Sequence, residues 1–322
     1  MKKSVLITGG SGFIGTNLVN YLVNKGYIVH NVDKISDVST PEKFKPQNKN
    51  YFFYKFDISN KFKLSRLLKK NFHFIIHLAA ESHVDRSIDG PSKFYLNNVK
   101  SNLALYETLR SLKKKTKLLT KVIHVSTDEV YGSIKKGSFK ENSMIYTSSP
   151  YSSSKASSEN IAQSYSETFN INVCILRITN NYGPYQHPEK LIPKVIINLI
   201  NNKKIPIYNK GNEIRDWIYV EDHINAIINL IFKSKIGQIY NVGSNNTQSN
   251  INLVKKIISI YNIENKKNIK FNKVIKFVKD RPGHDYRYAI DPHKLESTLG
   301  WSPQTNWELG IQKTISSYLD KI

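Results

Sequence analysis

Residues 4–15 read SVLITGGSGFIG, and this stretch decides the fold of the chain. Its first part, Ser4–Thr8, is aliphatic and β-branched, which predicts a short buried strand. Glycines follow at three-residue spacing, and the helical pattern of Phe13–Lys25 ends at Gly26. A glycine-rich turn between a strand and a helix points backbone N–H groups at an anion such as a pyrophosphate. The stretch therefore predicts the first unit of a dinucleotide-binding sheet.

The same alternation of strand-like and helical segments continues outward from this unit. Each apolar run predicts a further parallel strand, and the intervening segments are long enough for crossover helices. The fold class we expect is α/β, a Rossmann-type doubly wound parallel sheet of at least six strands. The five further runs are Ile28–Asp33, Tyr51–Lys55, Phe74–Ala79, Lys121–Ser126 and Asn172–Arg177.

Beyond residue 180 the pattern loosens into turn-rich stretches, which predicts a smaller, interwoven C-terminal substrate domain. We expect residues 1–180 plus 217–243 to form the cofactor-binding domain. Residues 181–216 plus 244–322 would form the substrate domain.

Composition narrows the class of protein. The chain has 322 residues, of which 39% are hydrophobic and 23% charged, enough for a full globular core and unlike a disordered chain. Its single cysteine, Cys174, excludes an internal disulfide and a cysteine-based metal cluster, so we expect no metal and a reducing, cytoplasmic setting. No apolar run approaches the ~18 residues of a spanning helix, so no membrane contact is expected.

The net charge of +23 raises the alternative of nucleic-acid binding. Only seven of the 48 basic residues are arginine, whereas base-edge recognition depends on arginine forks. The lysines are scattered rather than grouped into one stripe. We therefore expect no nucleic-acid partner, although a positive field also favours a small diphosphate substrate.

Residues for a cofactor lie at successive predicted strand ends. Asp33 ends the second strand, where a carboxylate accepts hydrogen bonds from an adenosine ribose and repels a 2′-phosphate. This favours NAD over NADP. The expected NAD contacts are Gly9, Gly12, Phe13, Ile14, Gly15, Asp33, Asp57, Ile58, Ala79, Ala80 and Ser82.

Tyr151 and Lys155 lie four residues apart, on one face of a predicted helix. At that spacing the ammonium would lower the phenol's pKa from about 10 toward neutrality. Tyr151 is distinguished by its context, because it follows a Ser-Pro turn and opens a helix. The same spacing recurs at three other pairs, Tyr21/Lys25, Tyr51/Lys55 and Tyr131/Lys135.

Thr127, Asp128 and Glu129 follow the fifth predicted strand and so emerge at the carboxyl edge of the sheet. Adjacent carboxylates repel each other and raise one pKa, which suits a general acid beside a general base. The alternative is a polar turn that only caps the strand.

Seven segments carry a resemblance that covers almost the whole chain: ITGGSGFIG, HLAAESHVDRSIDGPSKF, VSTDEVYG, YSSSKASSE, RITNNYGPYQHPEKLIP, RDWIYVEDH and DRPGHDYRYAID. The sequence resembles the nucleoside-diphosphate-glucose 4,6-dehydratases of the extended short-chain dehydrogenase/reductase family. The resemblance implies NAD held throughout turnover, a nucleotide-sugar-binding second domain and a homodimer. It also implies formation of a 4-keto-6-deoxyglucose nucleotide from dTDP- or UDP-glucose, a step toward deoxysugars such as rhamnose.

The resemblance also implies residue roles. Tyr151 and Lys155 would be the oxidising pair, Thr127 would hold the sugar's O4, and Asp128 and Glu129 would be acid and base. Asn98 and Asn181 would lie on the cofactor side. Substrate contacts would come from Ser82, His83, Asn180, Lys190, Arg215, Asn250, Arg281 and His284.

Two departures from the family pattern and several alternatives remain. Asn97 stands where the family often has Thr, and segment 132–150 is short, which affects how the sugar is covered. A nucleotide-sugar 4-epimerase would share the glycine turn and Tyr151 but needs no acid/base pair for water loss. A dehydratase of N-acetylated sugars would carry Lys in place of Glu129. A non-catalytic NAD-binding regulatory protein would not need the catalytic set, and the choice between uridine and deoxythymidine stays open.

Overall fold

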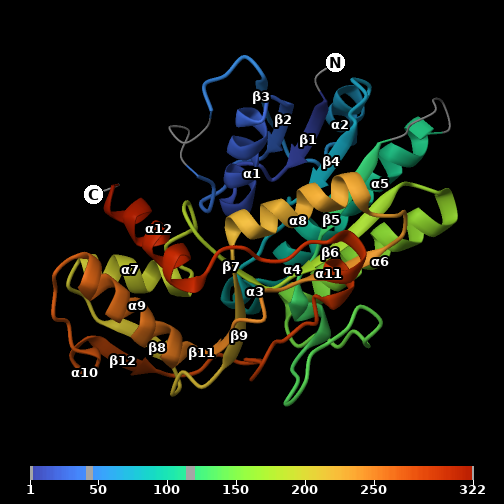
Figure 1. Ribbon diagram of the computed structural model, residues 1–322. Coiled ribbons are helices and arrows are strands. Elements are labelled where there is room, and N and C mark those ends of the chain that lie inside the picture. Colours follow the sequence, from blue (N-terminus) through green and yellow to red (C-terminus); the bar gives the residue numbers. More distant parts are fainter. Residues whose placement is uncertain (1–2, 41–45, 114–119, 321–322) are drawn as a thin grey trace.

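A sheet of seven parallel strands forms the centre of the protein (Figure 1). The computed structural model describes residues 3–40, 46–113 and 120–320. The strand order is β10-β6-β5-β4-β1-β2-β3, which confirms the predicted doubly wound α/β class. Six strands match the prediction closely, whereas β10 was missed. The strands are β1 (Ser4–Thr8), β2 (Ile28–Asp33), β3 (Tyr51–Lys55), β4 (Phe74–His77), β5 (Lys121–Val125), β6 (Val173–Ile178) and β10 (Ile239–Val242).

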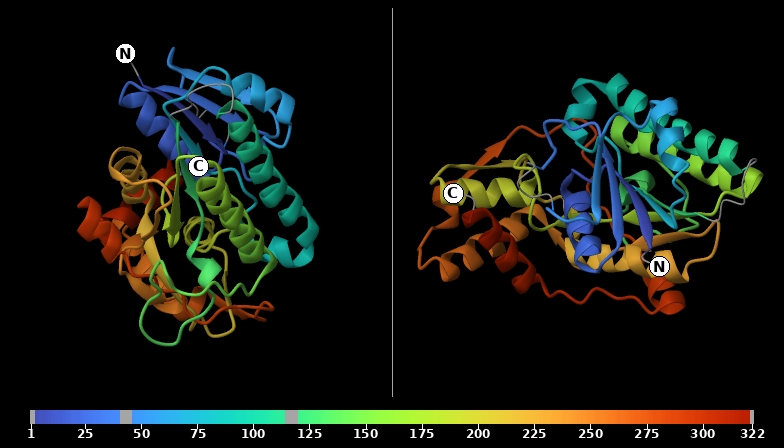
Figure 2. Two further views of the ribbon diagram at one scale, coloured as in Figure 1. Left: turned by 90° about the vertical axis from the view of Figure 1, so that its right-hand side faces the viewer. Right: turned by 90° about the horizontal axis from the view of Figure 1, so that it is seen from above.

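Helices cover both faces of this sheet (Figure 2). One layer contains α2 (Lys61–Leu68), α5 (Lys100–Lys113) and α6 (Pro150–Phe169), and the other contains α1 (Phe13–Asn24) and α8 (Val220–Lys233). The connection between β2 and β3 is long enough for a crossover helix, but its described part, residues 34–40 and 46–50, contains no helix. Shorter helices carry the chain past the strand ends: α3 (Val84–Asp89), α4 (Pro91–Phe94), the π-helix η2 (Tyr95–Val99) and the 3-10 helix η3 (Asp128–Tyr131).

The C-terminal elements form a smaller layer beside the sheet. Two small sheets, β11-β9-β7 and β12-β8, lie there with four helices. The strands are β7 (Asn180–Tyr182), β8 (Ile205–Tyr208), β9 (Ile214–Tyr219), β11 (Thr247–Ser249) and β12 (Ile275–Val278). The helices are α7 (Leu191–Ile200), α9 (Asn250–Glu264), α10 (Phe271–Val274) and α12 (Trp307–Leu319).

The two parts interweave. All seven strands of the large sheet fall within the ranges 1–180 and 217–243. The helix α11 (His293–Leu299), however, packs against β10 and α8 although it lies in the range assigned to the substrate domain. The division into two domains stays a prediction.

One hydrophobic cluster joins the two parts. It runs from Val5 and Ile7 in β1 to Ile192 in α7 and Ile311 in α12, all fully buried. Burial of each such side chain contributes about 1.5–3 kcal/mol. The edge at which β1, β4 and β5 end is therefore held rigidly against the smaller part. No helix within the described ranges is both long and apolar enough to cross a membrane.

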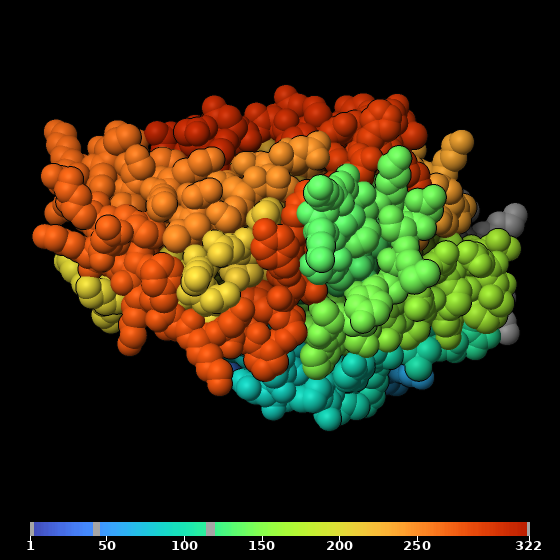
Figure 3. Space-filling model, turned by 90° about the horizontal axis from the view of Figure 1, so that it is seen from below, coloured from blue at the N-terminus to red at the C-terminus, as the bar shows by residue number. Residues whose placement is uncertain are grey.

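The segment that follows η3 lies against the C-terminal part on one face of the molecule, as green beside orange-red in Figure 3. The backbone N–H of Phe139 donates to the carbonyl of Ala289 at 2.9 Å, and that of Ile134 donates to the carbonyl of Arg287 at 3.1 Å. These backbone hydrogen bonds hold the segment after η3 against the C-terminal part.

Candidate active site

A cavity of about 250 Å³ opens at the carboxyl ends of β1, β2 and β4, beside the point where the strand order reverses. This is the position at which open α/β sheets bind ligands. Of the predicted NAD contacts, every one except Asn98 and Asn181 lines this cavity. Lys34 and Arg86 line it as well, and sequence reasoning did not assign them to it. Asn97, which departs from the family pattern at a cofactor contact, also lines this cavity.

The glycines of the first turn fit a pyrophosphate. A Cβ on Gly9 would lie 2.7 Å from the Ala79 backbone, and one on Gly15 would lie 2.3 Å from the Gly9 carbonyl oxygen. A Cβ on Gly12 would meet only that carbonyl oxygen, at 3.5 Å, and would fill part of the cavity instead. Gly12 caps α1 without a side-chain hydrogen bond, so the first N–H groups of α1 are available to an anion.

Asp33 is fixed at the end of β2 by two backbone donors. Ser11 N donates to its Oδ2 at 3.0 Å, and Ile35 N donates to its Oδ1 at 2.8 Å. The neighbouring Lys34 forms an ion pair with Glu81 at 3.2 Å. The Glu81 carboxylate offsets the positive charge of Lys34. The negative charge of Asp33 therefore prevails where the adenosine ribose would bind, which favours NAD over NADP.

The two predicted asparagines lie elsewhere. Asn98 is fully buried, and its amide donates to Ser154 Oγ at 2.8 Å and to the Glu81 carbonyl at 3.1 Å. The preceding Asn97 faces the cavity instead, because the π-turn of η2 shifts the residues away from ordinary helical spacing. Asn181 lines a second cavity, where its Oδ1 lies 3.0 Å from His223 Nδ1.

This second cavity, of about 350 Å³, adjoins the first and lies between the large sheet and the smaller part. Tyr151 and Ser126 line both cavities. Every predicted substrate residue lines the second cavity, together with Thr127, Asp128 and Glu129. The fold thus brings to one place residues that are spread from 82 to 284 along the chain.

The acid/base pair sits at the start of η3. Thr127 Oγ1 accepts a hydrogen bond from Glu129 N at 3.3 Å and donates to Asp128 Oδ1 at 3.3 Å. Burial raises the pKa of Asp128 to about 8, and the Glu129 charge adds to the rise. Burial also raises the pKa of Glu129, against the pull of Arg281, Arg215 and Lys190. The predicted upward shift is confirmed, and it affects both carboxyl groups.

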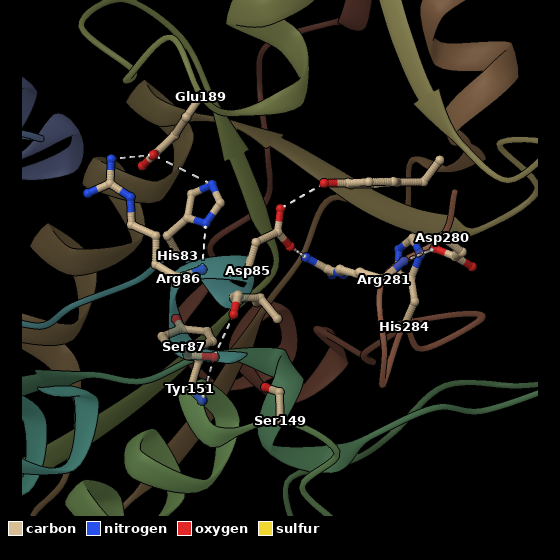
Figure 4. Close-up of polar contacts among 12 residues, drawn as sticks. His83, Asp85, Arg86, Ser87, Ser149, Tyr151, Glu189, Asp280, Arg281 and His284 are labelled. Carbon is tan, nitrogen blue, oxygen red and sulfur yellow. Dashed lines mark hydrogen bonds and ion pairs between the residues drawn. The ribbon is translucent and has the colours of Figure 1, made fainter. Parts of the chain in front are cut away.

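Tyr151 is presented by the first turn of α6. A capping box between Ser149 and Ser152 fixes that turn. Tyr151 is 8% exposed, and its backbone N–H donates to Ser87 Oγ at 3.2 Å (Figure 4).

The predicted lowering of the phenol's pKa by Lys155 is wrong for the chain by itself. Burial and the Glu129 charge raise the pKa of Tyr151, whereas the facing hydroxyl of Thr127 lowers it. Lys155 Nζ donates instead to the carbonyl of Val125 at 2.6 Å, and burial lowers the pKa of this lysine to about 8. The pair still borders the cofactor cavity, where a bound cation would favour the tyrosinate.

Segment 82–86 links the two parts of the protein (Figure 4). Asp85 Oδ1 accepts from Arg281 Nη1 at 2.7 Å, and its Oδ2 accepts from the Tyr208 hydroxyl at 3.0 Å. Lys190 Nζ donates to the carbonyl of Ser82 at 2.9 Å. Sequence reasoning missed Asp85 and Tyr208, since no sequence pattern pairs residues 196 positions apart.

The cationic groups of the second cavity are held in place by the chain. Arg215 donates to the carbonyls of Ile214 at 2.8 Å and Asp285 at 2.9 Å. His284 Nδ1 lies 2.6 Å from Asp280 Oδ1. Glu213, Asp280 and His284 lie close enough together to be considered as metal ligands. The contact between Asp280 and His284 already accounts for these two side chains, so we assign no metal site to the group.

The chain matches known proteins along nearly its full length. The family model of GDP-mannose 4,6 dehydratase matches residues 6–314. A probable dTDP-glucose 4,6-dehydratase of Sinorhizobium fredii is 43% identical, over 98% of this chain and 93% of the relative. A dTDP-glucose 4,6-dehydratase from Streptomyces venezuelae, solved with NAD and TYD bound, superposes with a TM-score of 0.91 at 35% identity, over 98% of this chain and 97% of that one.

A UDP-glucose 4-epimerase from Thermotoga maritima shares the fold, with a TM-score of 0.87 at 25% identity over 99% of both chains. The family match and the 43% identity are more specific than this shared fold. They show that the chain belongs to the GDP-mannose 4,6-dehydratase family.

Proposed function

We propose that this protein is an NAD-dependent sugar-nucleotide 4,6-dehydratase that converts dTDP-glucose or UDP-glucose into the 4-keto-6-deoxyglucose nucleotide and water. One observation carries this proposal: Tyr151, Asp128 and Glu129 line the same cavity, beside a site that fits a dinucleotide. Oxidation at C4 and elimination across C5 and C6 need three proton-transfer groups. An epimerase needs only the first.

The cofactor site would hold NAD through the first turn and Asp33. The N–H groups at the start of α1 would bind the pyrophosphate, and the Asp33 carboxylate would bind the adenosine ribose. Bound NAD supplies a hydride acceptor for C4 and a hydride donor for C6.

In the proposed reaction, the residues of the site act one after another. Tyrosinate 151 takes the proton of the C4 hydroxyl as C4 is oxidised, which makes the C5 hydrogen acidic. Glu129 then removes the C5 proton, and Asp128 protonates the C6 hydroxyl, which leaves as water. Glu129 returns a proton to C5 when C6 is reduced.

The raised pKa values suit these roles. At neutral pH a carboxyl group with a pKa of about 8 is protonated, as an acid must be, and Asp128 meets this condition. Three cations, Lys190, Arg215 and Arg281, hold Glu129 closer to its ionised form. The same cations would neutralise the diphosphate. Asn180, Asn250 and His284 would bond to the ribose or the base.

The deciding experiment is incubation of the purified protein with dTDP-glucose and UDP-glucose separately, followed by mass analysis of the products. We expect loss of one water from at least one substrate. A product of unchanged mass would favour the 4-epimerase. No conversion, with NAD bound, would favour the non-catalytic regulatory protein.

We further propose a cytoplasmic homodimer that serves deoxysugar formation, of which rhamnose is one example. The large exposed side chains of η2 and α5 support a dimer, because Leu96 is 62% exposed and Leu103 is 41% exposed. We expect Leu96→Glu to convert dimers to monomers in light scattering, and an unaltered mass would contradict that interface. Deoxysugar formation would show as production of the keto sugar by cells that express the protein.

A further inference from the structure

The reaction of the proposed function leaves the protein in a different protonation state from the one in which it began. Tyr151 gains the proton of the C4 hydroxyl, and the 4-keto product does not take it back. Asp128 gives its proton to the departing water. Glu129 gains one proton and returns one. Each turnover therefore ends with one proton too many on Tyr151 and one too few on Asp128, and the next cannot begin until that proton has moved.

Bulk solvent has limited access to these two groups. Tyr151 is 8% exposed and Asp128 is 3% exposed, and the hydroxyl-bearing Thr127 between them is 6% exposed. A hydroxyl group both accepts and donates a hydrogen bond, so it can pass a proton between a buried donor and a buried acceptor. The geometry of Thr127 meets this requirement.

Thr127 faces both partners. Its hydroxyl lies 3.3 Å from Asp128 Oδ1 and also faces the Tyr151 phenol. Its backbone-capping contact comes from Glu129 N, a donor, so the hydroxyl hydrogen of Thr127 is not needed there. Asp128 Oδ2 is buried as well. Asp128 Oδ1 therefore faces Thr127, and the Thr179 hydroxyl also approaches this carboxyl group and lowers its pKa.

We propose that Thr127 returns the proton from Tyr151 to Asp128 after each turnover. The Tyr151 O–H bond breaks as its proton passes to Thr127 Oγ1, and the Thr127 O–H bond breaks as its own proton passes to Asp128 Oδ1. A tyrosinate and a carboxylic acid result, the state from which oxidation starts. No electrons move, and no further reactant is needed. Burial raises the pKa of Asp128 to about 8, which makes it a better proton acceptor than an ordinary carboxylate. A bound cofactor cation would favour the tyrosinate against the raised pKa of Tyr151.

The test compares the first turnover with the steady state in Thr127→Val, which keeps the shape of the side chain but lacks the hydroxyl group. During storage, solvent has time to restore the starting state, so the first turnover needs no proton return. Rapid-quench mass analysis with excess nucleotide sugar should show one equivalent of 6-deoxy product per site. Later turnovers should then run on the order of 10-fold or more slowly. Direct effects on sugar binding slow both phases alike and leave their ratio unchanged.

Two controls make the test decisive. Thr127→Ser keeps the hydroxyl and should return the ratio of the two phases to the wild-type value. Imidazole, a small proton carrier, should speed the later turnovers of Thr127→Val and leave its first turnover unchanged. If Thr127→Val slows both phases equally, the proposed proton return is wrong and Thr127 acts on the sugar alone. If the wild type releases no water at all, the proposed function itself is wrong, and mass analysis separates these two failures.

Discussion

The two cavities of the protein are built in different ways. Most of the residues that line the cofactor cavity lie in short segments that directly follow β1, β2, β3 and β4, although later residues such as Asn97, Tyr151 and Lys155 complete it. The substrate cavity collects single side chains from segments far apart in the chain, such as Asp85 and Arg281, which are separated by 196 positions. Local sequence therefore specifies most of the first cavity, whereas the second exists only once the two parts have packed.

The largest effect is expected at Tyr151, where the cavities meet. Tyr151→Phe removes the base for the first oxidation, so turnover should fall on the order of 10³-fold while nucleotide binding is retained. Rapid mixing with substrate would measure reduction of bound NAD. Tyr21→Phe, which breaks another Tyr-x-x-x-Lys pair, should leave that signal unchanged. Rapid reduction in Tyr151→Phe would remove this residue from the mechanism.

A single added side chain in the cofactor cavity should be enough to weaken NAD binding. Gly12 has a φ of −77°, so Gly12→Val introduces no backbone strain but fills the space beside the helix terminus. NAD affinity should drop on the order of 100-fold, with the melting temperature of the NAD-free protein nearly unchanged. Gly90→Val, outside both cavities, is the control. Purification of Gly12→Val with a full complement of NAD would disprove the pyrophosphate site.

The substrate cavity should be more tolerant, because several cations share the diphosphate. Asp85→Asn removes the ion pair that orients Arg281, and we expect KM to rise on the order of 10-fold with little change in kcat. The exposed Asp89 lies on the same helix, so Asp89→Asn is the matched control. Tighter substrate binding in Asp85→Asn would mean that Asp85 competes with the diphosphate rather than orienting Arg281.

A further effect is on stability rather than on turnover or binding. The pKa of Asp128 is about 8 in the folded protein, against ~3.9 in an unfolded chain. The folded state thus holds a proton that the unfolded state loses between these values, and stability falls by up to roughly 1.4 kcal/mol per pH unit across that window. Asp128→Asn removes this cost. Its melting temperature should exceed that of the wild type by a margin that grows from pH 4 to pH 8, and a constant margin would contradict the raised pKa.

The same contrast explains what the sequence could predict. The turn around Gly12 and the strand before it could be predicted because each rests on a local pattern. The strand β10 was missed because Ile239–Val242 is four residues long and lacks a distinct period. The assignment of Asn98 to the cofactor side came from the family resemblance, whereas the π-turn of η2 brings Asn97 to the cavity.

Electrostatics was predicted in part. The raised pKa of Asp128 could be predicted because Asp128 and Glu129 are neighbours in the chain. The prediction that Lys155 lowers the pKa of Tyr151 was wrong because the direction of a side chain depends on its surroundings. The Lys155 ammonium donates its hydrogen bond to the Val125 carbonyl instead. The contact of Asp85 with Arg281 required the packed structure, since residue spacing carries no information about it.

The central claim is that oxidation and elimination depend on different residues of one site. The most direct measurement is a single-turnover absorbance trace of Glu129→Gln at the NADH band, with mass analysis of the sugar. Since the amide cannot take the C5 proton, bound NAD should be reduced once and persist beside an unreleased 4-keto-glucose nucleotide that still holds its C6 oxygen. Formation of the 6-deoxy product by Glu129→Gln at the wild-type rate would contradict the account.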